Sequence, residues 1–153
     1  MSRVYFEKVG RVEDLAVDDE VTRWHFDHGW IWNVLEIDRD NRVVRPLGVF
    51  FATLLCGDGA VIHCSSIPGI SIHWSLTLAA FRKAIRMLAP VCGILLATIP
   101  EERRALLRVI RRLGFREIGS FPRDGERVLL LKYRQDAPDP PPAPPRISSP
   151  RDR

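Results

Sequence analysis

The spacing of hydrophobic residues changes most clearly between residues 91 and 115, where it predicts a strand followed by a helix. Residues 91–98 form a short apolar run after Pro90, which is typical of a buried strand. Pro100 predicts a helix start, because its missing N–H and fixed φ suit the first helical position. Gly114 predicts the helix end, and the apolar positions between them follow a 3.6-residue period: Ala105, Leu106, Val109, Ile110 and Leu113.

Alternating or β-branched segments predict six further strands, at residues 4–9, 31–37, 43–55, 60–66, 116–120 and 127–133. Pro46 and Gly48 predict an edge position or a bulge in the third of these. Asp124-Gly125 predicts a two-residue turn of the primed type. Helical spacing predicts a helix over residues 71–88 that Ser71 caps, and one or two short helices within residues 11–28. The pattern as a whole predicts an α/β fold of the α+β type.

Length and composition indicate one domain followed by a tail. The 153 residues are 46% hydrophobic, which is enough for a single packed core. We expect the domain to span residues 1–135, because residues 136–153 are rich in proline and poor in apolar side chains. That composition predicts a disordered tail, with a ligand for a proline-recognising groove as the alternative. No apolar run is long enough to span a membrane and no signal segment is visible, so we expect a cytoplasmic protein without membrane contact.

The net charge of +4 is a mild excess that is concentrated in one segment. Residues 101–116 carry six arginines against two glutamates. These arginines predict a solvated face or contacts with phosphates or an acidic partner, and nucleic-acid binding is a weaker hypothesis because no groove-reading motif accompanies them. The odd number of cysteines, without C-x-x-C spacing, predicts neither a disulfide framework nor a zinc site: Cys56, Cys64 and Cys92.

The segment from Pro100 through Leu113-Gly114-Phe115 to a hairpin ending at Tyr133 resembles the C-terminal half of GNAT-type N-acyltransferases. The resemblance covers roughly residues 30–134 and extends to degenerate and phage-encoded members of the family. It implies a mixed, mostly antiparallel sheet of about seven strands flanked by helices. It also implies acetyl-CoA as co-substrate, with its pantetheine between splayed strands 60–66 and 91–98 and its pyrophosphate at a helix N-terminus.

The resemblance assigns cofactor contacts to the end of strand 60–66, the loop 67–74 and the region after strand 91–98. The residues concerned are Cys64, Ser65, Ser66, Ile67, Gly69, Ile70, Ser71, Ile72, His73, Trp74, Thr98 and Arg103. The loop departs from the family signature of Arg or Gln, two residues, Gly, one residue, then Gly or Ala, because Gly69 is its only glycine. Trp74 either obstructs the phosphates or points away from them.

Two positions in the helix after Pro100 also depart from the family. Arg103 stands where many members carry an asparagine that contacts the cofactor. Ile110 stands where many carry a tyrosine that protonates the departing thiolate. Water, backbone N–H groups, Ser65 or Ser66 would have to stabilise the thiolate instead.

The reaction needs a general base and an acceptor pocket, and the sequence offers candidates for both. His63 or Glu36 is the expected base, although His63 is alternatively a hydrogen-bonded core residue and Glu36 the partner of an arginine across the sheet. Aromatic residues near the first strands are either an acceptor pocket or core: Trp24, Phe26, Trp30 and Trp32. His25, Asp27 and His28 lack an evident fourth ligand, so we expect no metal site.

Two hypotheses about function follow. The first is an N-acetyltransferase that moves an acetyl group from acetyl-CoA to an amine of a small molecule or a protein by direct attack. The second is a catalytically inactive GNAT-fold module that binds CoA or another protein, which the altered loop, Arg103 and Ile110 would explain. Either protein is a monomer or a dimer. Complete pairing of strands 60–66 and 91–98, or a Trp74 side chain plugging the gap between them, would refute the transferase hypothesis.

Overall fold

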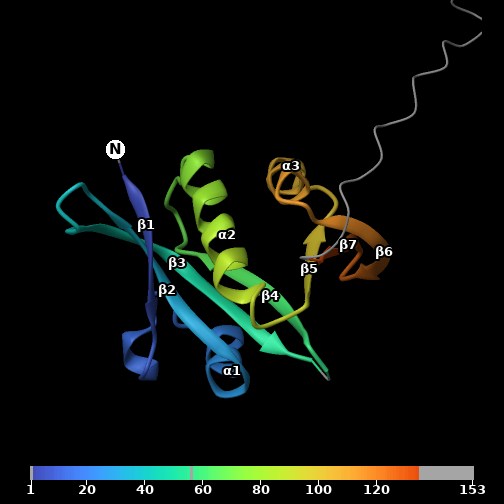
Figure 1. Cartoon of the computed structure of the whole chain (residues 1–153), viewed down its shortest axis with the longest axis horizontal. Coiled ribbons are helices and arrows are strands. Elements are labelled where there is room, and N and C mark those ends of the chain that lie inside the picture. Colours follow the sequence, from blue (N-terminus) through green and yellow to red (C-terminus); the bar gives the residue numbers. More distant parts are fainter. Residues whose placement is uncertain (1, 56, 135–153) are drawn as a thin grey trace, which may run out of the picture.

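A computed structural model describes residues 2–55 and 57–134 (Figure 1). Within these residues the strands are β1 (Arg3–Lys8), β2 (Trp30–Ile37), β3 (Val43–Leu54), β4 (Gly59–Ser66), β5 (Ile94–Pro100), β6 (Arg116–Arg123) and β7 (Glu126–Arg134). The helices are the 3-10 helix η1 (Val12–Asp14), α1 (Glu20–His28), α2 (Trp74–Leu88) and α3 (Arg104–Arg112). The expected tail at 136–153, the domain end at 135 and Cys56 lie outside the described residues.

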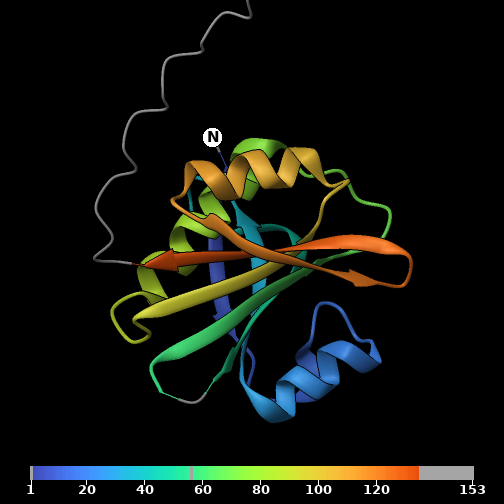
Figure 2. The same ribbon diagram turned by 90° about the vertical axis from the view of Figure 1, so that its right-hand side faces the viewer.

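All seven strands form one sheet in the order β1-β2-β3-β4-β5-β7-β6. Every neighbouring pair is antiparallel except β4 and β5, which are parallel. The predicted mixed, mostly antiparallel sheet is therefore confirmed. Figure 2 shows α2 and α3 on one side of the sheet and α1 on the other.

Each face of the sheet carries its own core, because successive side chains of a strand point to opposite faces. Phe50, Ile62 and Leu95 belong to the larger core, which α2 and α3 cover. Val49 and Phe51 belong to the smaller core on the α1 side. Neighbouring residues of β3 thus serve both faces, and the same alternation decides which side chains of β4 can meet a ligand on either side.

The predicted irregularity in β3 is a bulge. Val34 pairs with Gly48 and Leu35 with Pro46, so that Leu47 is the extra residue. The edge alternative is wrong, since β3 lies between β2 and β4. Gly48 is required here because a Cβ atom would collide with the backbone oxygen of Ser65.

Two element starts differ from the sequence prediction. α2 begins at Trp74 and is capped by His73, not by Ser71. β5 begins at Ile94 instead of residue 91. The N–H groups of Val91 and Cys92 bond to the oxygen of Leu88 at 2.9 and 2.7 Å and so close the preceding helix. Val91 is consequently 65% exposed and lies outside the strand.

The predicted helix start at Pro100 is wrong. Pro100 is the last residue of β5 and pairs with Val128 of β7. Pairing with β7 continues one residue further, because the N–H of Glu101 donates to the oxygen of Arg127 at 2.9 Å. The first helical residue is Arg104.

The buried face of α3 also differs at two positions from the predicted stripe. Leu107 is 3% exposed and Ile110 is fully buried, whereas Ala105 is exposed. The remaining stripe residues, Leu106, Val109 and Leu113, are half-buried. Gly114 ends the helix with a φ of 103°, as predicted.

The β6–β7 hairpin has the predicted turn. Asp124 and Gly125 have φ values of 51° and 79°, which is the primed geometry that suits twisted strands. The strands are longer than predicted, and β6 extends to Arg123. This extension brings Arg123 beside the candidate site.

Candidate functional site

The two parallel strands in the middle of the sheet separate at one end. β4 and β5 pair only from Gly59 with Ile94 to Ile62 with Ala97. Beyond these pairs β4 continues along β3 to Ser66, and β5 continues along β7 to Pro100. Because each strand keeps only its outer partner, residues 63–66 and 98–100 enclose an opening that we call the slot.

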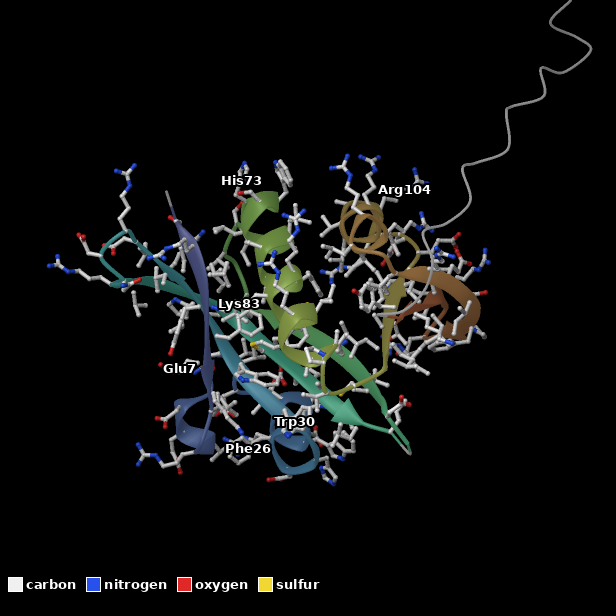
Figure 3. The ribbon with its side chains drawn as sticks, viewed as in Figure 1. Glu7, Phe26, Trp30, His73, Lys83 and Arg104 are labelled. Atoms are coloured by element: carbon white, nitrogen blue, oxygen red, sulfur yellow. The ribbon has the colours of Figure 1, made fainter. Side chains whose placement is uncertain are left out.

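The slot contains a cavity of about 240 Å³ whose lining includes residues from both faces of the sheet. On the α2/α3 side it is lined by Cys64, Phe81 and Leu106, and on the other side by His63. Above the slot, between the start of α2 and α3, lies an open groove of about 560 Å³ whose wall includes Trp74 and Arg104. Figure 3 shows His73 and Arg104 at this same end of the molecule.

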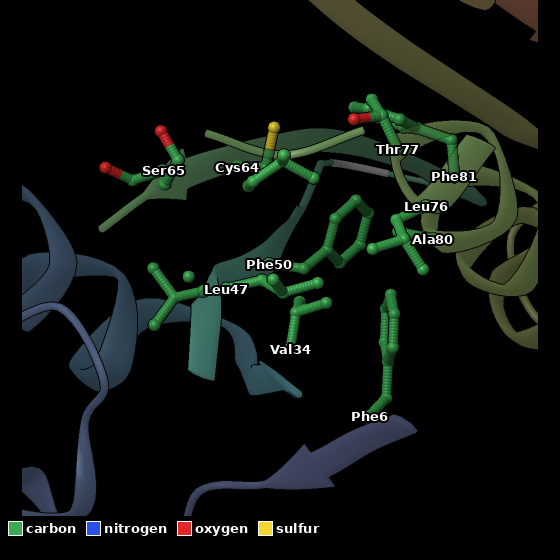
Figure 4. Close-up of a pocket in the computed structure, with 14 residues that line it drawn as sticks. Phe6, Val34, Leu47, Phe50, Cys64, Ser65, Leu76, Thr77, Ala80 and Phe81 are labelled. Carbon is green, nitrogen blue, oxygen red and sulfur yellow. The ribbon is translucent and has the colours of Figure 1, made fainter. Parts of the chain in front are cut away.

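A separate, smaller cavity lies beside the slot, between α2 and the sheet (Figure 4). It measures about 80 Å³ and is lined mainly by apolar side chains, among them Phe6, Val34, Phe50 and Ala80. No charged side chain lines it. Charged side chains line the slot and the groove instead: Glu102, Arg103, Arg104 and Arg123.

The loop 67–74 offers a row of free backbone donors. Among the described residues, none accepts a hydrogen bond from the N–H groups of residues 69–74. Gly69 has a φ of 80°, and the N–H of Ile67 ties the loop to the oxygen of Leu47 at 2.9 Å. Arg45 fixes the other end by donating to the oxygen of Ser71 at 3.1 Å. These donors lead into the N-terminus of α2, where the helix dipole is positive and favours anions.

Trp74 does not close the slot. Its side chain is 58% exposed and lines the groove, and it is not part of the slot lining. Ile72 lies beside it in the same wall. The groove therefore remains open towards the loop and the slot.

His63 lies in the slot with its ring 5.1 Å from that of Phe51. Partial burial lowers the pKa of His63 below its ordinary 6.5, and the charges of Arg123 and Arg103 lower it further. A histidine with a depressed pKa is neutral at pH 7, so His63 can accept a proton there.

The hydrogen bonds of the four histidines separate His63 from the rest. Within the described residues, the ring nitrogens of His63 have no hydrogen-bond partner. The other three rings each have one: His25 with Thr53 Oγ1 at 2.8 Å, His28 with the Trp24 oxygen at 2.7 Å, and His73 with Ser75 Oγ at 2.7 Å. His63 thus lacks the partner expected of a purely structural histidine.

Glu36 lies on β2, two strands away from the slot. Its Oε2 accepts a hydrogen bond from Arg45 Nε at 2.7 Å, and Arg45 is its partner across the sheet. Hydrogen bonds from Ser2 and from Arg45 lower the pKa of Glu36. Glu36 is therefore the partner of an arginine across the sheet, which was the alternative to its role as a general base.

Several predicted cofactor residues meet around the slot and the groove. Arg103 lines both, Thr98 lines the slot, and Ser66 lines the groove. Cys64 lines both and is exposed to them, yet desolvation by the surrounding protein raises the pKa of its thiol to about 11. Ser65 lines only the smaller cavity. The half-buried Ile67 and Ile70 pack on opposite cores, so their side chains anchor the loop.

The four aromatic residues of the expected acceptor pocket do not form one group, although the rings of Trp30 and Trp32 lie 6.5 Å apart. Trp30 and Trp32 pack against the larger core, and Phe26 packs against the smaller one. Trp24 is 50% exposed and stacks on His28, with ring centroids 4.1 Å apart. None of the four lines the slot.

Sequence comparison places the chain in no known family, since no family model and no curated protein matches it. Solved structures of several acetyltransferases, in contrast, match the fold of the chain. An acetyltransferase from Bacillus cereus described as acting on IAA matches with a TM-score of 0.62 at 10% identity, over 86% of this chain and 99% of its own. A spermidine/spermine N-acetyltransferase from Vibrio cholerae matches with a TM-score of 0.62 at 10% identity, over 87% and 93%.

A third match is a GNAT family acetyltransferase from Elizabethkingia anophelis with acetyl-CoA bound. Its TM-score is 0.57 at 11% identity, over 87% of this chain and 97% of its own. The chain has the fold of the GNAT acetyltransferases. At these identities the likeness concerns the fold alone, so activity in this GNAT-fold chain must be argued from its own residues.

Sequence reasoning missed one charged residue of the slot in this GNAT fold. Arg123 is part of the slot lining, although it lies 57 positions beyond the end of β4 in the chain. The neighbouring Asp124-Gly125 turn was recognisable, but the curl of the hairpin towards β4 is a tertiary feature. No signal in the local sequence could have indicated this placement.

Two further searches of the described residues concern metals and membranes. No group of three or more His, Cys, Asp or Glu side chains among residues 2–55 and 57–134 is arranged to hold a metal ion. In the same part of the chain, no helix has the length and apolar character needed to cross a membrane.

Proposed function

We propose that this protein is an acyl-CoA-dependent N-acyltransferase that transfers an acetyl group from acetyl-CoA to an amine. The observation that carries the proposal is the separation of β4 and β5 after Ile62 and Ala97. Strand edges with only one partner present unpaired backbone groups, which an extended amide-containing chain such as pantetheine can pair with. A slot of this kind serves no packing purpose and lowers the number of ladder bonds in the sheet.

The surroundings of the slot support binding of an anionic nucleotide. The free N–H groups of residues 69–74 and the N-terminus of α2 suit a pyrophosphate. Arg103 and Arg104 line the groove beside them and outweigh the single carboxylate of its wall, Glu102. In this proposal, binding of the pyrophosphate therefore relies on backbone N–H donors and arginines, because the loop lacks the glycine pattern of the family.

The slot residues also support direct attack of the amine on the thioester. The amine lone pair attacks the carbonyl carbon, the C–N bond forms, and the C–S bond breaks with its electron pair on sulfur. His63, neutral and without a hydrogen-bond partner among the described residues, takes the proton that the amine nitrogen loses. The thiolate takes up a proton from water, because Ile110 offers no acidic group. Cys64 is protonated at neutral pH and is unsuited to form an acyl-enzyme.

A second candidate function is an inactive module that binds acyl-CoA or a protein without turnover. The buried Ile110 favours it, because this residue occupies the position of the tyrosine that many GNAT enzymes use as an acid. Binding and turnover therefore have to be measured separately.

Thermal denaturation with acetyl-CoA tests binding. Acetyl-CoA at a hundred times its Kd should stabilise the fold by about 2.7 kcal/mol. Absence of any shift with acetyl-CoA or longer acyl-CoAs would refute both CoA binding and the transferase proposal. A shift without release of free CoA in the presence of a panel of amines would leave the inactive module as the function.

Substitution of two histidines tests the role of His63. His63→Gln should lower kcat by about 10²- to 10⁴-fold while the melting temperature and acetyl-CoA binding change little. His25→Gln is the matched control, since His25 stacks on the same Phe51 ring at 3.9 Å but bonds to Thr53. It should lower stability more than turnover. Equal losses of turnover in the two variants would refute His63 as the base.

A further inference from the structure

The slot carries positive charge that no carboxylate in its lining balances. Arg103 and Arg123 both line it, while Cys64 is protonated and His63 neutral at pH 7. No aspartate or glutamate is part of the lining. An occupant of the slot therefore meets two guanidinium groups and no negative side chain.

Two nearby arginines, one in β7 and one in α3, are paired with carboxylates. Arg127 lies 3.4 Å from Glu101 and Arg111 lies 3.6 Å from Glu117. Arg103 and Arg123 form no ion pair with any described residue. Glu126 is the partner of Arg123 across the β6–β7 hairpin, and Glu102 lines the groove together with Arg103, but neither carboxylate lines the slot.

Only one of the two slot arginines also lines the groove. Arg103 also lines the groove, on the side where the cofactor phosphates are proposed to bind. Arg123 lines the slot without lining the groove, and its charge acts on His63 more strongly than that of Arg103. Arg123 is thus the cation on the side of the proposed base, where the acceptor amine must stand.

We propose that the acceptor is a small amine that carries a carboxylate close to its amino group, as an α-amino acid does, and that Arg123 binds this carboxylate. The inference rests on the proposed transferase function and names its substrate class. A guanidinium presents a planar fork of donors that matches a carboxylate with two parallel hydrogen bonds. The same charge repels polyamines, whose additional ammonium groups would find no counter-ion in the slot.

The test compares acceptors that differ only in the carboxylate. With acetyl-CoA held constant, CoA release is measured with a pool of L-α-amino acids, with the pool of their α-amides, and with spermidine. We expect the amino acids to react at least tenfold faster than the amides or spermidine. Arg123→Gln should raise the KM for the amino acids by about tenfold or more and remove the preference, while the KM for acetyl-CoA is unchanged. Arg108→Gln, on the exposed face of α3 and outside the slot lining, is the matched control and should change neither KM.

Two outcomes would overturn the inference and leave the transferase intact. One is equal or faster turnover of the amides or spermidine. The other is an Arg123→Gln effect on the KM for acetyl-CoA instead of the acceptor, which would make Arg123 a cofactor residue. If no turnover is seen, thermal denaturation of the CoA-bound protein with the amino-acid pool tests acceptor binding directly. The inference is wrong if the pool raises the Tm of the wild type no more than that of Arg123→Gln. Failure of acetyl-CoA itself to bind overturns the transferase proposal instead.

Discussion

Leu106 and Leu107 are consecutive residues of α3 with opposite surroundings, and their truncation should have opposite consequences. Leu107 is 3% exposed and belongs to the larger core. Leu106 is half-buried and lines both the slot and the groove. A Leu→Ala change removes the same atoms at both positions, so any difference in effect reports on the position alone.

The structure sets the size of the two effects. Truncation of a fully buried leucine costs about 3 kcal/mol, from lost burial and the cavity left behind. For a domain of this size that corresponds to a fall in Tm of about 10 °C for Leu107→Ala. Leu106→Ala should cost only about 1 kcal/mol of stability, because part of its surface is already exposed. It should also remove about 1 kcal/mol of apolar contact with pantetheine and raise the KM for acetyl-CoA about fivefold.

Thermal denaturation and acetyl-CoA kinetics on the two variants provide the assay. Ala105→Gln is the control for the helix surface and should change stability by less than about 0.5 kcal/mol, since Ala105 is exposed. A larger fall in Tm for Leu106→Ala than for Leu107→Ala would show that the rotation of α3 about its axis is wrong. An altered KM for acetyl-CoA in Leu107→Ala but not in Leu106→Ala would refute the assignment of the groove to the cofactor.

Three other predictions follow from the bulge, the thiol and the histidines. Gly48→Ala should destabilise the fold by about 1 to 3 kcal/mol in denaturant titrations, because the new Cβ collides with the Ser65 oxygen and pushes β3 away from β4; an unchanged midpoint would contradict this contact. Cys64→Ser should keep kcat within about threefold, because a thiol with a pKa of about 11 is almost fully protonated at pH 7.5. For the same reason, intact-mass spectrometry of the unmodified protein after incubation with acetyl-CoA should detect no acetylated protein. An acetyl adduct on the thiol would refute direct attack. The pKa values of His25 and His63 are lowered in the fold, so the unfolded chain binds more protons below pH 6.5. The stability of the fold should therefore be fully present above that pH and fall as the pH decreases, less steeply in His63→Gln. A Tm that rises on acidification would contradict this prediction.

The periodicity of the chain was enough to predict the seven strands, because alternation and turn residues are local, whereas the class of sheet was implied by the resemblance. It was not enough to place the start of α3. Pro100 satisfies the preferences of a first helical residue and also those of a strand end with one partner, and only pairing with Val128 selects the strand. Leu107 was missed because α3 has a broad apolar face and only packing decides which part of it is fully buried; Leu107 and Ile110 are buried, whereas Leu106 is half-buried.

The candidate site was predictable where it depends on the order of elements and unpredictable where it depends on tertiary contacts. The slot and the loop 67–74 follow from a strand, a loop and a helix in sequence, which is what the resemblance captured. His63 could be named as a candidate, but its free ring nitrogens are visible only once the partners of the other histidines are known. Arg123 lines the slot through the placement of the β6–β7 hairpin, and the packing of Trp30 against the larger core is likewise a tertiary contact.

The short ladder between β4 and β5 also has a mechanical consequence. Within the sheet, strands β1–β4 are joined to strands β5–β7 by only four residue pairs, from Gly59–Ile94 to Ile62–Ala97. Local opening of such a seam needs less free energy than global unfolding. An acyl-CoA thioester bound across this junction would hold the two parts of the sheet together. Its binding would therefore make the molecule more rigid as well as supply the acyl group for the reaction.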